Sequence, residues 1–185
     1  KLYVNGVLVA TKTYSGTIVN ANNNLCIGSI SHSDMRYMTG RIDEVRIWNV
    51  VRTAVEITDN VHHSVTSPNL VAYYKMDGGS GTVLTDDSGN GHTAELIGSP
   101  SWTTEPPREY SLELSSPNKY VDCGDNFTFY TNSNLTLEAW IYPTEFGDES
   151  NPSTILSRRN TYISPYYWWL GYEGRTLFFQ LKLTS

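Results

Sequence analysis

The acidic side chains are the first candidates for chemistry, because paired carboxylates are the simplest route to hydrolysis. A retaining glycoside hydrolase needs two carboxylates about 5 Å apart, usually on alternate residues of one strand. The nearest pattern is Arg41-Ile42-Asp43-Glu44-Val45-Arg46, where arginines stand at the positions that the two acids would need. The sequence therefore predicts no catalytic residues and favours a protein that is not an enzyme.

Other reactive groups are equally sparse. The four histidines, His32, His62, His63 and His92, lack the spacing of a metal site or of a nucleophile–base pair. No Gly-x-Ser-x-Gly motif of a serine hydrolase occurs. Cys26 and Cys123 lie in apolar runs, which favours two buried thiols over a disulfide or a metal pair.

An aromatic run near the end of the chain is a candidate for ligand binding. Tyr166 and Trp168 would share one face of a strand, and such rings can stack on sugars. Aromatic side chains more often pack in a core, so we favour packing over glycan binding here. Tyr166 and Trp168 remain the weak ligand-binding candidates, and the ligand itself is unknown.

Most of the chain alternates with a period of two between Gly, Asn, Asp and Pro residues, which is typical of strands and turns. Asn5-Gly6 between two apolar runs predicts a tight hairpin. The further strands are expected at 24–28, 40–49, 70–76, 110–114, 120–124, 135–143, 166–172 and 176–183. One short helix is expected at 52–57, with Thr53 and Glu56 in capping-box spacing.

The expected strand at 135–143 is amphipathic. Leu135, Leu137, Ala139 and Ile141 would face a core, opposite a face that carries Thr136, Glu138, Trp140 and Tyr142. Many short strands with one short helix predict an all-β protein, a two-sheet antiparallel sandwich or barrel.

The charge and the apolar runs of the chain limit the kinds of partner that it is expected to have. A formal net charge of −6 over 185 residues, without a run of Lys and Arg, makes nucleic acid an unlikely partner. The apolar runs are shorter than the roughly 20 residues of a membrane-spanning helix. Lys1-Leu2-Tyr3-Val4 is not a signal peptide and predicts that the chain is part of something longer.

Two blocks of motifs resemble the bacterial laminin-G-like (concanavalin A-like) jelly-roll family. Residues 1–66 resemble the C-terminal part of such a domain, through 2–6, 25–28 and above all Gly40-Arg41-Ile42-Asp43-Glu44-Val45-Arg46-Ile47-Trp48-Asn49. Residues 67–185 resemble the N-terminal part of a second domain, or of the same domain in permuted order, through 70–77, 87–92, 120–124 and 137–141. The resemblance covers nearly the whole chain and implies a jelly-roll sandwich.

The order of the blocks leaves two alternatives. The chain spans the junction of two tandem domains, or it is one period of a repeat array. Because half a sandwich exposes unpaired edges, we expect the halves to complete each other, within the chain or with neighbouring copies. The alternative is that flanking sequence completes them.

The resemblance also implies a structural calcium ion, Ca2+. It would be held by Asp43 from a strand and by Asp87 and Asn90 from a Gly-rich loop, since calcium takes oxygen ligands. The composition of the loop on its own indicates only a turn.

The function implied by the resemblance is that of an extracellular, non-catalytic binding or structural module, serving adhesion, matrix or filament building in a tandem-repeat protein. Its partners would be neighbouring copies or adjacent domains, and possibly glycans. The alternative is a carbohydrate-binding module appended to a secreted glycan-active enzyme. A hydrolase is the least favoured interpretation.

Overall fold

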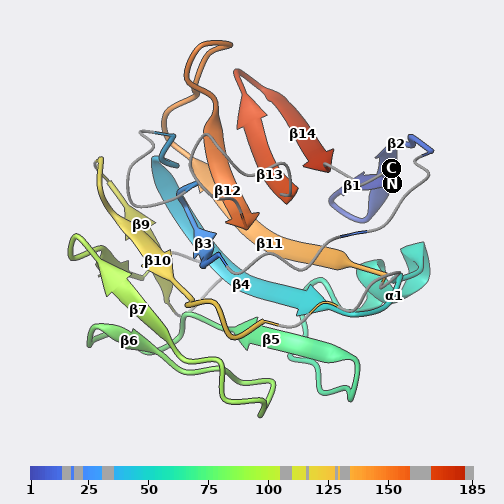
Figure 1. Cartoon of the computed structure of the whole chain (residues 1–185), viewed down its shortest axis with the longest axis horizontal. Coiled ribbons are helices and arrows are strands. Elements are labelled where there is room, and N and C mark those ends of the chain that lie inside the picture. The colour runs from blue at the N-terminus through green and yellow to red at the C-terminus, as the bar shows by residue number, and fades with distance from the viewer. Residues whose placement is uncertain are drawn as a thin grey trace.

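The computed structural model describes residues 1–13, 18, 23–30, 36–104, 110–115, 117–127, 129, 134–158 and 168–181. In these residues the chain forms an antiparallel sandwich of two sheets, with a small separate hairpin beside it (Figure 1). The predicted all-β fold class is confirmed. Among the described residues, no helix is long and apolar enough to cross a membrane.

The larger sheet has seven strands among the residues that the structure describes. In spatial order they are β14 (Thr176–Leu181), β13 (Trp168–Glu173), β12 (Ser153–Arg158), β3 (Leu25–Ile27), β10 (Tyr120–Asp122), β7 (Ala94–Ile97) and β6 (Val83–Leu84). The second sheet has β11 (Thr136–Pro143), β4 (Gly40–Trp48), β9 (Ser111–Leu114) and β8 (Ser101–Thr103), and β5 (Leu70–Tyr74) also pairs with β4.

The hairpin of β1 (Leu2–Val4) and β2 (Val7–Ala10) forms a two-stranded sheet of its own. Asn5 and Gly6 have φ values of 50° and 77°, as expected for a two-residue hairpin turn. The predicted helix is also present as α1 (Ala54–Asp59). Thr53 is its N-cap, and Thr53 and Glu56 form a complete capping box.

The two segments of the sequence are interleaved in both sheets. β3 lies between β12 and β10, and β4 lies between β11 and β9, so strands from residues 1–66 pair with strands from 67–185. Strands of the two segments therefore pair with one another within one chain. Where the domain boundaries of the parent protein lie stays a prediction.

The core lies between the two sheets and is deepest at their middle strands. Leu25 and Ile27 of β3 and Val45 and Ile47 of β4 are fully buried. Cys26 and Cys123 are both free and buried, which confirms the prediction of core thiols. Burial raises the pKa of Cys26 to about 12 and raises that of Cys123 well above its ordinary value, so both are held as thiols.

A second, smaller apolar cluster covers the outer face of the sheet of β4 and β5. Trp48, Leu70 and Tyr73 form it, with Val50 and Val65 packed against them. Trp140 of β11 lies on the same face and donates a hydrogen bond from its indole nitrogen to the carbonyl of Val61 at 2.7 Å. The segment that contains α1 is thereby fixed against the sheet.

Candidate functional site

The candidate site is a pocket of about 510 Å³ that runs along β11 and opens between the two sheets. Seven consecutive residues, 135–141, form one wall of this pocket. Side chains from the facing sheet (Ile155, Leu170, Leu177 and Phe179) form a second wall, and the β1 strand with the turn that follows it forms a third. Most of the lining is apolar, which is the usual character of a ligand pocket.

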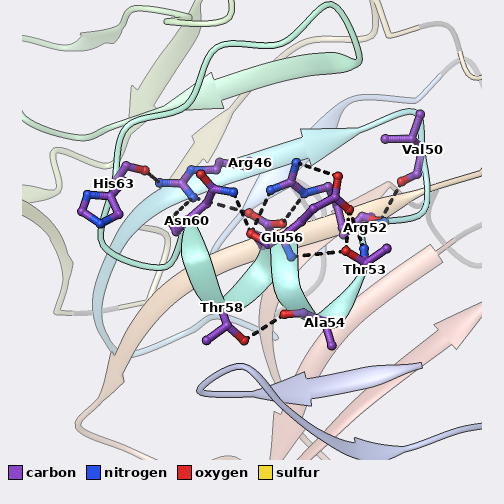
Figure 2. A network of polar contacts seen from close by, with 11 residues as sticks. Arg46, Val50, Arg52, Thr53, Ala54, Glu56, Thr58, Asn60 and His63 are labelled. Carbon is purple, nitrogen blue, oxygen red and sulfur yellow. Dashed lines mark hydrogen bonds and ion pairs between the residues drawn. The ribbon is translucent and has the colours of Figure 1, made fainter.

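One end of the pocket is polar, and its centre is Arg46 of β4. The guanidinium of Arg46 donates to the carbonyls of Asn60 at 2.9 Å and His63 at 2.8 Å, and to the hydroxyl of Tyr73 at 3.3 Å. Figure 2 shows Arg46 reaching from its strand to the segment that follows α1. Burial alone would lower the pKa of Arg46, but Tyr73 and Glu44 outweigh it and raise the pKa above its ordinary value.

Two carboxylates converge on this arginine. Glu44 is ion-paired with Arg46 and also accepts a hydrogen bond from the Tyr73 hydroxyl at 2.6 Å. Glu138 of β11 lies 3.5 Å from Arg46 and 3.5 Å from Arg52, measured between carboxylate oxygen and guanidinium nitrogen. Burial raises the pKa of Glu138 more than the two arginines lower it.

The backbone is irregular at this point. The pairing of β4 with β11 shifts register between Glu138 and Trp140, so that Glu44 and Val45 together face Ala139. Glu44 has a φ of 53°, which is rare for a non-glycine residue and marks the extra residue of a β-bulge. The bulge turns Glu44 toward Arg46 and Tyr73, where its carboxylate is bound.

Arg52 links this polar end to α1. Its guanidinium lies 4.0 Å above the ring of Trp48, and its Nη2 donates to the carbonyl of Glu56 at 3.1 Å. Thr136 of β11 donates to the carbonyl of Val50 at 2.7 Å and accepts from the Arg52 amide at 3.1 Å. Arg52, Thr53 and Glu56 appear together at the start of the helix in Figure 2.

Glu44 and Glu138 both contact Arg46, so the two carboxylates lie near one another. The sequence alone did not reveal this proximity, because the two residues are 94 positions apart (138 − 44). Each carboxylate is ion-paired, Glu44 with Arg46 and Glu138 with both arginines. We call this ion-paired cluster of Arg46, Arg52, Glu44 and Glu138 the clamp, because it joins β4, β11 and the segment that contains α1.

The predicted calcium ligands are engaged with protein groups. The Asn90 amide donates to the carbonyls of Leu70 and Val71 at 2.8 and 3.0 Å, and Asp87 is ion-paired with Lys75 at 3.2 Å. Asp43 is buried and accepts a hydrogen bond from the Glu44 amide. Among the described residues, no group of three or more His, Cys, Asp or Glu side chains is placed to hold a metal ion. A calcium ion held by Asp43, Asp87 and Asn90 stays a prediction.

Asp86, beside the predicted ligand Asp87, has a clear structural role. Its carboxylate accepts hydrogen bonds from the backbone amides of Tyr73, Ser88 and His92 at 3.0, 2.9 and 2.9 Å. Burial would raise the pKa of Asp86, but hydrogen bonds from Ser88, Tyr73 and His92 outweigh it and lower the pKa. The loop is thus closed by a buried carboxylate.

The two weak ligand-binding candidates have different outcomes. Tyr166 lies outside the described residues. Trp168 is 2% exposed, belongs to the main core and packs edge-on against Phe129, with ring centres 6.3 Å apart. Its indole leaves no free face for a sugar, as the packing interpretation predicts.

Fold and site together define an antiparallel β-sandwich with a mostly apolar pocket, in which the buried acids are paired with arginines. Residues 1–58 match the Laminin_G_3 family model, described as the concanavalin A-like lectin/glucanases superfamily. This segment is similar to the laminin-G-like family, as its motifs predicted. No curated protein and no solved structure matches the chain.

Proposed function

We propose that this chain is a non-catalytic binding or structural module of an extracellular protein, of the kind that serves adhesion or the building of a matrix or filament. The observation that carries the proposal is the pocket along β11. It offers apolar side chains and a strand edge, which suit binding, while its two acids are held by Arg46 and Arg52.

The experiment that tests this proposal combines a binding assay with an activity assay on the 185-residue chain. We expect no turnover of β-glucans and, for a purely structural module, no saturable binding on a glycan array. Turnover that disappears in the Glu138→Gln variant would contradict the proposal, because it would assign a catalytic carboxylate to the clamp.

A carbohydrate-binding module is the second candidate, and one exposed aromatic residue favours it. Tyr142 at the end of β11 is 59% exposed, and the guanidinium of Arg41 lies 4.4 Å above its ring. An exposed ring beside a cation suits sugar stacking. Saturable binding to a glycan that Tyr142→Ala removes, with no effect of Phe146→Ala at another exposed ring, would support this function.

Calcium remains a proposal that rests on the resemblance alone. Calorimetry with CaCl₂ tests it on the folded chain. A saturable heat that Asp87→Asn abolishes would support an ion at Asp43, Asp87 and Asn90. If calorimetry detected no heat of binding, the proposal of a calcium ion in this module would be wrong.

A further inference from the structure

Strand β11 has one edge paired and one edge along the pocket. Its register with β4 runs from Thr136↔Trp48 to Pro143↔Gly40, and β4 is its partner strand in the described part of the chain. The opposite edge borders the pocket. An edge strand of this kind presents unpaired backbone groups that can accept another strand.

The side chains of β11 indicate that the core is unfilled on this side. Leu135, Leu137, Ala139 and Ile141 are half-buried, whereas Ile42, Val45 and Ile47 of the adjacent β4 are at most 1% exposed. Leu170, Leu177 and Phe179 of the facing sheet are half-buried as well and line the same pocket. A volume of about 510 Å³ is far larger than a packing defect.

The same chain carries an exposed apolar strand of suitable chemistry. In β2, Val7, Leu8 and Val9 are 64%, 48% and 54% exposed. The strand Val7-Leu8-Val9-Ala10 has no charge and no proline. Charged residues and prolines usually protect the edges of natural sheets against pairing. An exposed apolar strand that lacks both therefore indicates a pairing surface.

The exposed strand β2 and the edge of β11 therefore occur in one molecule, on the same side of the sandwich. The β1 strand of the hairpin lines the pocket beside β11, and β2 is its outer strand (Figure 1). Building on the binding role proposed above, we propose that the occupant of the β11 edge is a second copy of this chain. The β2 strand of each copy pairs with the free edge of β11 in the other, and Val7 and Val9, which share one face, enter the pocket.

The test measures the self-association of the whole chain by sedimentation from about 1 to 500 µM, together with amide hydrogen exchange. We expect association that rises with concentration and slows exchange in β11 and β2. The Val7→Asp/Val9→Asp variant should associate about a hundredfold more weakly, because two buried valines lose their apolar contacts. Val83→Asp, at a 56% exposed valine of β6 in the other sheet, is the matched control and should associate normally.

A competition experiment keeps the proposal testable if the double variant folds poorly. A synthetic peptide of residues 1–12 should dissociate the wild-type assembly, and a scrambled peptide should not. A monomer throughout the concentration range would overturn the proposal. So would an assembly that is insensitive to the double substitution or that protects strands other than β11. A monomer that binds a glycan would leave the binding module intact, and a monomer that hydrolyses β-glucans would remove both proposals.

Discussion

Replacing Arg46 with methionine removes the cation at the centre of the buried clamp while keeping most of the side-chain volume. Arg46 has a side chain that is 3% exposed, and it binds the carbonyls of Asn60 and His63. The variant would leave the carboxylate of Glu44 without its buried cation, and Glu138 with Arg52 alone. It would also release the segment that follows α1 from the sheet.

The expected loss of stability follows from these contacts. Breaking a buried ion pair by removing one partner usually costs about 3–5 kcal/mol, since a charge is left buried. Hydrogen bonds from a charged donor add about 1.5–3 kcal/mol each, but the effects are not additive, because the segment can rehydrate. We therefore expect the free energy of unfolding to fall by about 4 kcal/mol, or about 8–16 °C in Tm for a chain of this size.

Urea unfolding and thermal melting would measure this loss. Arg41→Met is the matched control, because Arg41 lies on the same strand but packs on the exposed Tyr142, and its loss should stay below about 1 kcal/mol. Arg46→Lys should fall between the two, since it keeps the charge and loses the forked geometry. If Arg46→Met were no more harmful than Arg41→Met, the clamp would not be stabilising the fold and the reasoning would be wrong.

Three further predictions concern the clamp, the loop and the helix. Glu138→Gln should change the free energy of unfolding at pH 7 by less than about 1 kcal/mol, because the cost of burying the Glu138 carboxylate, which raises its pKa, offsets its attraction to the two arginines. Urea unfolding across pH should show the corresponding wild-type stability present below pH 4.5 and lost as the pH rises through the folded-state pKa, and a flat response in the variant. Asp86, whose pKa is lowered, should stabilise the chain above pH 3.8 and lose this effect as the pH falls through its folded-state pKa, so acid melts should show an acid-sensitive step that Asp86→Asn lacks. Thr53→Ala should cost about 1 kcal/mol in a thermal melt, because it removes the N-cap of α1, while Val55→Ala, at an exposed position of the same helix, should have little effect.

The regular alternation of the sequence predicted the fold class and most of the strands. The hairpin turn at Asn5-Gly6, the capping box at Thr53 and the core face of β11 are all confirmed. These features depend on neighbours two to four residues apart, so the sequence contains the necessary information locally.

Strand β12 was not predicted, and its composition explains why. Ser153, Thr154, Ser157 and Arg158 are buried there among only two apolar residues. The Ser157 hydroxyl donates to the carbonyls of Ser29 and Ile30 at 2.8 and 3.0 Å, so its burial depends on a segment more than 120 positions away. The three short strands β6, β7 and β8 were missed as well, because they lie between closely spaced turns.

The candidate site was harder to predict than the fold. Glu138 and Arg46 were recognised as members of strands, but their ion pair depends on the register between β11 and β4. The bulge at Glu44 alters that register by one residue, and a single sequence carries no signal for it, since glutamate rarely has a positive φ. The ion pairs of the candidate site therefore depend on contacts between strands that are far apart in the sequence.

The two buried thiols lie where the segments of the chain meet. Cys26 in β3 faces Asp122 of β10, and the Cys123 amide donates to the carbonyl of Leu25 at 2.9 Å. Because a protonated, enclosed sulfur does not react with alkylating reagents, each modification event reports that β3 and β10 have separated. The rate at which Cys26 and Cys123 are alkylated, followed by mass spectrometry, therefore measures how often β3 and β10 separate.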